Sequence, residues 1–298
     1  MMIGGKESTE SFIAISKVIS EALESTQVPN TAIQLVTTRD VIPQLLGLDQ
    51  YIDLVIPRGS NELVRYIKSS TKIPVLGHAD GLCSIYLEHS ADPTMAVKVI
   101  VDSKTTYPAA CNSVETLLVE ESSLEMLLPP VAKALLEKGV SLRCDATSKQ
   151  ALAANLDTHL AAILQDADPS DFDTEHLSLT LAIKTVSDIS AAVTHINTHG
   201  SHHTDVILTS NTPLAEQFMA GVDSAGVFWN TSTRMADGMR FGFGTEVGIS
   251  TNKIHARGPV GLEGLMIYKY KIRGCGQITA DYGEGEGQKS FLHEVFDM

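Results

Sequence analysis

Basic residues, cysteines and long apolar runs are scarce in this sequence. The 298 residues include 22 Lys and Arg against 36 Asp and Glu, which gives a formal net charge of -14. A protein that neutralises nucleic-acid phosphates needs a basic face, and no dense cluster of Lys and Arg supplies one. The two longest apolar stretches, residues 97–101 and 177–186, are far shorter than a membrane span. Neither a nucleic-acid partner nor a membrane span is expected.

Cysteines are few and scattered along the chain: Cys83, Cys111, Cys144 and Cys275. They have neither the density of a disulfide framework nor the spacing of a metal site. Residues 1–6 hold one positive charge and no extended apolar stretch, so no secretory signal is expected. A reducing cytoplasm is the predicted location.

Two common functional motifs are also missing. No Gly-x-Ser-x-Gly segment supports a Ser-His-Asp hydrolase, and no Gly-x-Gly-x-x-Gly segment marks a dinucleotide site. Histidines cluster between residues 195 and 203, but only His195 and His199 have the spacing that lets one helical face present two ligands. No carboxylate motif accompanies them, so no metal is expected. A separate hypothesis is that His202 or His203 faces an active site between two domains.

The sequence does contain an alternation of strand-like and helix-like segments. Its hydrophobic fraction of 43% and charged fraction of 19% are those of a globular protein, and its length suits two domains. After an amphipathic helix that starts at Ser8 or Thr9, strands are predicted at 32–36, 51–56 and 74–76, with helices at 41–46 and 61–67. This order predicts a parallel sheet that binds ligands beyond the carboxyl ends of its strands. The loops at those ends are residues 37–39, 57–60 and 77–81.

From residue 84 onward the same alternation predicts a second α/β domain. Besides the apolar run that ends at Val119, strands are predicted at 84–87, 142–145, 160–164, 179–186, 206–209 and 226–229. Helices are predicted at 92–104, 122–137, 189–196 and 213–220. The predicted fold class is therefore α/β.

Cys111 stands out among the four cysteines because of its position. It lies in a Pro-containing loop, residues 107–113, directly before the apolar run that ends at Val119. A thiol on a loop held by a rigid strand suits a nucleophile, since a thiolate needs access and polar surroundings. The alternative is that Cys111 is a small buried hydrophobe, as we expect for Cys83 and Cys144.

Glycine is concentrated between residues 231 and 264, which predicts tight turns and close backbone approach to a strand or a ligand. Residues 265–272 then alternate like a strand, with Tyr268, Tyr270 and Ile272 on one side. The Gly-Glu tail at 283–287 is too polar to pack.

Five ordered segments closely resemble the gamma-glutamyl phosphate reductase family, a branch of the aldehyde dehydrogenase superfamily. They are residues 4–7, 56–59, 110–119, 241–251 and 255–263. The resemblance spans nearly the whole chain up to residue 272. It implies an aldehyde-dehydrogenase-like fold in three parts: the end of a partial Rossmann-type NADP-binding domain at 1–90, a catalytic domain at 91–262, and an oligomerisation strand with a flexible tail at 263–298.

The resemblance also implies a reaction, in which NADPH reduces L-glutamyl 5-phosphate to L-glutamate 5-semialdehyde with release of phosphate. Cys111 would be the nucleophile that forms a thioester, and its own N–H or that of Asn112 would hold the oxyanion. Lys6, Glu7, Gly59, Ser60 and Glu175 would bind the cofactor. Asn230, Ser232, Arg234 and His203 would face the small-molecule substrate, with Arg234 paired to a carboxylate or phosphate. The family also implies a homo-oligomer.

The chain departs from the family and its superfamily in two places. Hydrolytic aldehyde dehydrogenases carry a glutamate base in a Glu-Leu-Gly-Gly segment, and the matching stretch, residues 76–81, has none at that position. Asp80 lies close by, but we do not expect it to act as this base. Family members also begin well before the segment at 4–7, so we expect an N-terminally truncated chain. An impaired homologue that assembles with full-length subunits is the alternative function, and a coenzyme-A-acylating aldehyde dehydrogenase is disfavoured by the segment at 241–251.

Overall fold

The computed structural model describes residues 2–3 and 8–294 and separates into two compact units, residues 1–264 and 265–298. Among the described residues, no helix is long and apolar enough to cross a membrane.

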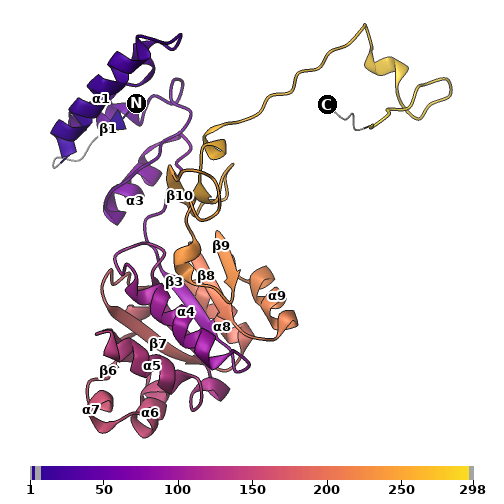
Figure 1. The fold of residues 1–298 in the computed structure, drawn as a ribbon. Coiled ribbons are helices and arrows are strands. Elements are labelled where there is room, and N and C mark those ends of the chain that lie inside the picture. The colour runs from indigo at the N-terminus through magenta and orange to yellow at the C-terminus, as the bar shows by residue number, and fades with distance from the viewer. Residues whose placement is uncertain (1, 4–7, 295–298) are drawn as a thin grey trace. The chain divides into compact units, whose positions relative to one another are not determined.

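A parallel sheet of seven strands organises the first unit (Figure 1). Its spatial order is β6-β5-β7-β4-β3-β8-β9. The strands are β3 (Cys83–Leu87), β4 (Val114–Glu120), β5 (Ser141–Cys144), β6 (Gln165–Asp166), β7 (Thr180–Val186), β8 (Thr204–Leu208) and β9 (Gly226–Trp229). The predicted α/β class is confirmed.

Helices cover both faces of this sheet, and successive strand residues alternate between two cores (Figure 1). Leu117 and Val119 join one core, whereas Leu118 between them joins the other. The first core includes residues of α4 (Pro93–Thr105), α5 (Leu128–Glu137) and α6 (Ala146–Asn155), and the second those of α8 (Ile189–His199) and α9 (Thr212–Gly221). Strands buried on both faces read as continuous apolar runs, which is why β4 is recognisable in the sequence.

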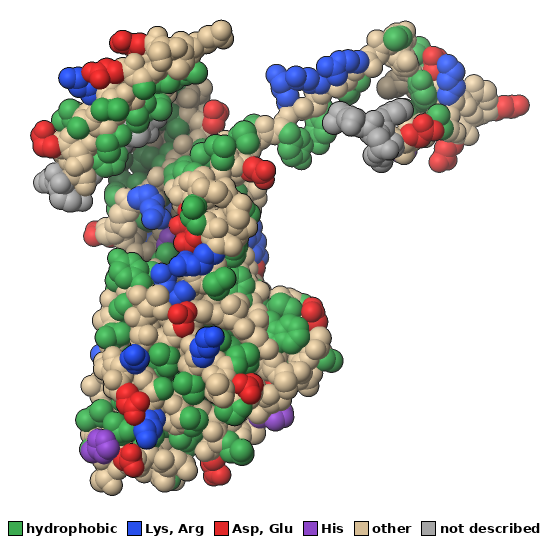
Figure 2. Space-filling view, in the orientation of Figure 1, with side chains coloured by type: hydrophobic (Ala, Val, Ile, Leu, Met, Phe, Trp, Pro, Cys, Tyr) green, Lys and Arg blue, Asp and Glu red, His purple; other side chains and the backbone are tan. Residues whose placement is uncertain are grey.

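The segment before β3 is packed much less. The short strands β1 (Met2–Ile3) and β2 (Leu35–Val36) pair in parallel, and helix α1 (Thr9–Leu23) has no buried residue. Apolar side chains on α1, Val18 among them at 64% exposure, gather on the surface (Figure 2). Helices α2 (Ile42–Leu45) and α3 (Asn61–Ser70) follow. A small core formed by Leu46, Ile67 and Val75 holds this region together.

Several predicted elements need correction. The strands predicted at 51–56 and 74–76 reduce to one bridge between Val55 and Val75. The strand predicted at 160–164 is wrong, because helix α7 (Thr158–Ala161) precedes the short strand β6. Helix α6 was not predicted, and the helix predicted at 122–137 begins only at Leu128. Strand β3, which lies before the predicted boundary at residue 90, pairs with β4 and β8, which lie after it. The division into functional domains stays a prediction.

The glycine-rich segment forms tight turns and one antiparallel pair, β10 (Gly248–Ser250) with β11 (Gly258–Val260). A Cβ atom on Gly238 would lie 2.6 Å from the Thr245 carbonyl oxygen, closer than such atoms approach.

Short 3-10 helices lie at Asn30–Ala32, Arg39–Val41, Glu121–Ser123, Pro169–Asp173, Thr233–Met235, Glu263–Leu265 and Thr279–Asp281.

The second unit has no buried side chain among its described residues, 265–294. The strand predicted at 265–272 is not formed with any described residue, and Tyr268, Tyr270 and Ile272 are each more than four-fifths exposed. A strand needs a neighbour to receive its backbone hydrogen bonds. No described segment of the chain supplies one here.

Candidate active site

A cavity of about 490 Å³ opens in the first unit. One wall, which we call the N-terminal wall, consists of Arg58, Gly59, Asn61 and His78, from loops that follow Val55 and Val75 and from the start of α3. The opposite wall, which we call the sheet wall, consists of Cys111, Asn112, Glu175 and Arg234. The loops that carry Cys111 and Glu175 lead into the amino ends of β4 and β7.

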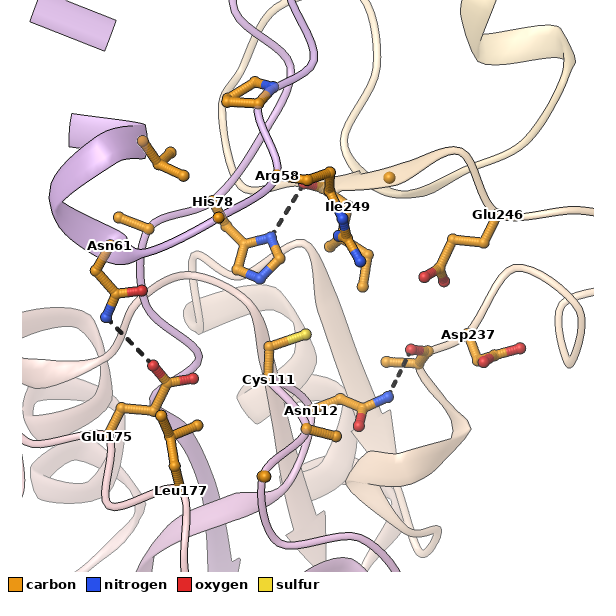
Figure 3. Close-up of a pocket in the computed structure, with 18 of the residues that line it drawn as sticks. Arg58, Asn61, His78, Cys111, Asn112, Glu175, Leu177, Asp237, Glu246 and Ile249 are labelled. Carbon is orange, nitrogen blue, oxygen red and sulfur yellow. Dashed lines mark hydrogen bonds between the residues drawn. The ribbon is translucent and has the colours of Figure 1, made fainter. Parts of the chain in front are cut away.

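Cys111 lies in a tight turn between α4 and β4, and its sulphur points into the cavity (Figure 3). The Ala110 N–H donates to the Tyr107 carbonyl at 3.1 Å, and the Ser113 N–H donates to Ala110 at 2.8 Å. Gly81 packs directly against this turn. A Cβ atom on Gly81 would lie only 2.1 Å from the Cys111 carbonyl oxygen, so only glycine fits there.

The thiol of Cys111 is protonated at neutral pH in this environment. Burial raises its pKa to about 11, the carboxylates of Glu175 and Glu246 add to the rise, and Arg58 and the residue's own backbone N–H oppose it. A thiolate therefore needs help when it forms, because burial has removed most of its solvation.

Asn112 follows the nucleophile candidate and is 5% exposed. Its side-chain amide donates to the Ala236 carbonyl at 2.9 Å, which ties the turn to the segment before the glycine-rich loops (Figure 3). The backbone N–H groups of Cys111 and Asn112 donate no hydrogen bond to another backbone or side-chain acceptor among the described residues. The family resemblance implies that one or the other holds an oxyanion, and this role stays a prediction.

Glu175 lines the same cavity and is held by two donors from the opposite loops. The Gly81 N–H donates to its Oε1 atom at 3.0 Å, and the Asn61 side chain donates to Oε2 at 3.4 Å (Figure 3). Its carboxylate is thereby oriented and keeps acceptor capacity for a ligand hydroxyl.

Two arginines line the cavity, Arg58 and Arg234. Neither makes an ion pair among the described residues, whereas each cavity carboxylate has a protein donor. The Arg234 guanidinium lies 5.9 Å over the Tyr107 ring, and its Nε atom is buried without a hydrogen-bond partner. Guanidinium groups without partners suit an anionic ligand such as a carboxylate or a phosphate.

Two histidines approach the cysteine from the N-terminal wall and from the start of β8. Their ring centroids lie 5.0 Å apart in an edge-on arrangement, and one ring nitrogen of each lies within 4.8 Å of the Cys111 sulphur. Burial, and then the neighbouring His78, lower the pKa of His203 to about 3. Burial also lowers the pKa of His78, so both rings are neutral at physiological pH.

A buried ion pair connects the segments that carry the sheet wall. The Lys104 Nζ atom donates to the Glu115 Oε2 atom at 2.7 Å and to the Val114 carbonyl at 2.9 Å. The other Glu115 oxygen accepts from the Leu177 N–H at 3.3 Å. The pair joins the end of α4, the start of β4 and the loop that carries Glu175.

The structure brings some predicted site residues to the cavity and not others. Ser60 caps α3, since its Oγ atom accepts from the Leu63 N–H at 3.4 Å. Asn230 forms hydrogen bonds with the Thr209 N–H at 3.0 Å and the Thr209 carbonyl at 2.8 Å, and Ser232 with Ser103 at 3.0 Å. These partners occupy both side chains outside the cavity wall. Lys6 and Glu7 lie outside the described residues. The roles assigned to all these residues stay predictions.

Sequence reasoning missed several cavity residues: Arg58, Asn61, His78, Asp237 and Glu246. Arg58 and His78 do lie in loops singled out as the ends of predicted strands. The two acidic residues lie in the glycine-rich segment that predicted close approach to a ligand. Those signals identify segments, but they do not say which side chain faces the cavity.

Asp80 does not occupy the position of a free base. Its carboxylate is bound by Arg65 and by the Asn61 side-chain amide. A carboxylate with two donors is poorly placed to activate water. The expectation that Asp80 has no such role agrees with this arrangement.

The fold places the chain among aldehyde-dehydrogenase-like proteins. A crystal structure of a probable aldehyde dehydrogenase from Listeria monocytogenes EGD-e matches 93% of this chain and 69% of its own, with a TM-score of 0.67 and 20% identity. Glyceraldehyde-3-phosphate dehydrogenase from Methanocaldococcus jannaschii, complexed with NADP, matches 78% and 57%, with a TM-score of 0.57 and 15% identity. At these identities the similarity concerns the fold alone. No protein-family model matches the chain.

Closer relatives define the family. A probable gamma-glutamyl phosphate reductase of Schizosaccharomyces pombe is 55% identical over 99% of this chain and 65% of its own length. Gamma-glutamyl phosphate reductase of Saccharomyces cerevisiae is 50% identical over 99% and 67%. The crystal structure of the Thermotoga maritima reductase matches 92% and 65%, with a TM-score of 0.86 and 36% identity. The chain belongs to the gamma-glutamyl phosphate reductase family, and it spans about two thirds of the length of these relatives.

Proposed function

We propose that this chain acts in the NADPH-dependent reduction of L-glutamyl 5-phosphate to L-glutamate 5-semialdehyde and phosphate, in L-proline biosynthesis in the cytoplasm. The observation that carries the proposal is a cavity-lining thiol, Cys111, in the same cavity as two arginines that make no ion pair with any described residue. The relatives named for this activity are longer chains, of which this chain spans about two thirds.

The arginines match the charges of this substrate. L-Glutamyl 5-phosphate is anionic at both ends, with an α-carboxylate at one and a phosphate at the other. Arg58 and Arg234 line the same cavity. A planar guanidinium binds either group through two parallel hydrogen bonds, so two arginines can orient both ends of the molecule.

The chemical step begins at Cys111. Its sulphur attacks the acyl carbon, the carbon–oxygen bond to phosphate breaks, and a thioester forms. The thiol proton leaves with the phosphate, whose oxygens accept it. The N–H groups of Cys111 and Asn112 donate to the carbonyl oxygen while it carries negative charge, and removal of one such donor typically costs about 2.7–4 kcal/mol.

The residues around the cavity fit a nicotinamide cofactor. Glu175 presents an oriented carboxylate that can accept from ribose hydroxyls, and the first turn of the ten-residue helix α3, next to Gly59 and Ser60, offers backbone N–H groups to a pyrophosphate. Lys6 and Glu7 are assigned to the adenosine ribose or its 2′-phosphate by resemblance only. NADPH supplies the hydride that reduces the thioester. Collapse of the resulting thiohemiacetal returns the electron pair to the Cys111 sulphur and releases the aldehyde.

Retention of the thioester until reduction requires that water is not activated against it. Asp80 is held by Arg65 and Asn61, and Glu175 by Gly81 and Asn61. No carboxylate that lines the cavity is free of a protein donor among the described residues, which favours reduction over hydrolysis.

The reverse reaction provides the test. The purified chain is given glutamate semialdehyde, NADP and phosphate, and NADPH formation is followed by absorbance. Cys111→Ala is expected to lower the rate on the order of 10⁴-fold or more, since no other group replaces the nucleophile. Cys275→Ser, at an exposed position, is the matched control and should retain the rate. Activity that survives Cys111→Ala would refute the thioester mechanism.

A homo-oligomer is part of the proposal. The second unit buries none of its described side chains, and its residues Ile267, Tyr268, Tyr270 and Ile272 are each more than four-fifths exposed. Such a segment suits a strand that pairs with a second copy of the chain. The same feature fits the alternative function, a partner of full-length subunits. Native mass measurement with and without a full-length relative separates the two, because the alternative requires a mixed oligomer.

A further inference from the structure

Three metal-binding side chains meet beside the cavity, although no sequence spacing connects them. His78, Cys111 and His203 each offer one ligand atom, and these atoms all lie within 4.8 Å of one another. They come from the loop before β3, the turn before β4 and the residue directly before β8. Two imidazoles and a thiolate form a ligand set that zinc prefers.

The hydrogen bonds of the two rings leave one nitrogen of each for a metal. The His78 Nδ1 atom lies 3.2 Å from the Ile249 carbonyl oxygen, which only accepts, so Nδ1 carries the proton and Nε2 has a free lone pair (Figure 3). His203 lies 2.9 Å from Thr204 Oγ1 through Nδ1. Histidine ligands of metals are commonly oriented in this way, by a hydrogen bond from the other ring nitrogen.

The Nε2 atom of His203 is an unpaired buried group. His203 is 1% exposed, and this atom has no hydrogen-bond partner among the described residues. A buried polar atom without a partner destabilises the fold, and a bound cation would offset that cost. This observation is independent of the clustering of the three residues.

The dimensions of the cluster allow coordination after a small shift. Zn–S bonds of about 2.3 Å and Zn–N bonds of about 2.0–2.1 Å place tetrahedral ligand atoms roughly 3.3–3.7 Å apart. Atoms now within 4.8 Å of one another need to approach by up to about 1.5 Å. Cys111 and His78 are both half-buried and lie on loops that line the cavity, so a cation can reach them from solvent.

We propose that His78, Cys111 and His203 form a reversible site for a thiophilic divalent cation, best matched by Zn²⁺, that caps the nucleophile. As the metal–sulphur bond forms, the Cys111 S–H bond breaks and its proton passes to solvent. The two imidazoles contribute lone pairs, and a water molecule or substrate oxygen completes the tetrahedron. Mg²⁺ and Ca²⁺ are excluded by the absence of an oxygen ligand in the set. Inhibition follows only if the proposed function holds, because the capped sulphur cannot then attack an acyl phosphate.

Cobalt binding tests the site without any turnover. The full chain, carrying Cys275→Ser to remove its exposed thiol and reduced with a phosphine, is titrated with Co²⁺. A thiolate-to-cobalt charge-transfer band in the near ultraviolet is expected, and one equivalent of Zn²⁺ should abolish it. Cys111→Ser should remove the band, and His78→Gln should weaken Co²⁺ binding at least about tenfold.

Further variants and an alkylation experiment serve as controls for the cobalt titration. His199→Gln, at a half-buried histidine outside the cluster, should bind Co²⁺ like the parent chain. His203→Gln should also weaken binding, and if it does not fold, His78→Gln on the cavity loop still tests the site. Alkylation of Cys111 at mildly alkaline pH, mapped by mass spectrometry, should slow in Zn²⁺ and recover with a chelator. Absence of the cobalt band in the parent, or a band that survives Cys111→Ser, overturns the proposal. Neither result depends on reductase activity, so the two proposals fail separately.

Discussion

The two walls of the cavity rest on very different amounts of packing. The sheet wall stands on two cores that include fully buried residues such as Leu117 and Leu118. The N-terminal wall stands on a small core of Leu46, Ile67 and Val75, next to a helix α1 that buries nothing. The proposed nucleophile therefore lies on the side with more buried packing, whereas Gly59, one of the proposed cofactor contacts, lies on the other.

The largest loss of unfolding free energy is expected when the buried ion pair between Lys104 and Glu115 is broken. Lys104→Met leaves the Glu115 carboxylate buried without its partner, which typically costs about 3–5 kcal/mol of unfolding free energy. Denaturant unfolding measures the change. Lys149→Met removes a surface pair with Asp166, whose side chain is 81% exposed, and should cost less than about 1 kcal/mol. Equal costs for the two variants would contradict the anchoring role of the buried pair.

The pH dependence of stability should carry a contribution from Asp205 beneath the sheet wall. Burial raises its pKa from 3.8 to about 7, although Ser224 and Ser84 donate to it. Between about pH 4 and 7 the native state holds this proton and the unfolded chain does not, so the unfolding free energy falls as pH rises. The contribution amounts to as much as ~4 kcal/mol.

Asp205→Asn isolates that contribution, because the amide does not titrate. When unfolding is measured at several pH values, the difference in unfolding free energy between the parent and the variant should shrink or change sign across this pH window. Asp166→Asn, at the exposed position, should follow the parent curve. If the unfolding free energies of Asp205→Asn and the parent change with pH in parallel, the native Asp205 carboxyl is ionised.

The contact between the two walls should be the next most sensitive place. Gly81→Ala forces a Cβ atom against the Cys111 backbone, which should cost about 1–3 kcal/mol and displace the thiol. Unfolding and the rate of Cys111 alkylation report the two effects. At Gly47 a Cβ atom would meet its nearest neighbour, the Gln44 carbonyl oxygen, at 3.4 Å, so Gly47→Ala should change neither.

The smallest effect is expected at the exposed helix of the N-terminal region. Val18→Ala removes a side chain that is 64% exposed on α1 and should change the unfolding free energy by less than about 0.5 kcal/mol. The same substitution at Val131, fully buried on α5, should cost about 2 kcal/mol. A large effect at Val18 would mean that α1 is covered in solution, for example by a second copy of the chain.

The fold could be predicted from the sequence where local signals agree. Helix α4 begins where expected because Asp92 caps it, accepting from the Met95 N–H at 2.7 Å, and Pro93 occupies its first turn. The strand predicted at residues 160–164 is wrong because Leu160 and Leu164 are four positions apart. That spacing is found in a helical turn as well as in a short apolar run. Both pack on the first core, so burial alone does not distinguish the two.

The site was predictable only in part, for a different reason. Cys111 can be found from its place before a strand and from the family motif around it. The closeness of His78 and His203 to Cys111 depends on how three loops meet, and no spacing in the sequence encodes it. Gly81 is likewise one glycine among 22 until the Cys111 turn is seen against it.

The place of Cys111 in the chain affects how the protein withstands chemical damage. Many reactive cysteines lie at the start of a helix, where the helix dipole favours a thiolate. Cys111 instead follows the end of α4 and precedes a strand, and its pKa of about 11 leaves little thiolate at neutral pH. Peroxides and alkylating agents attack the thiolate. Cys111 should therefore react slowly with both kinds of reagent at neutral pH.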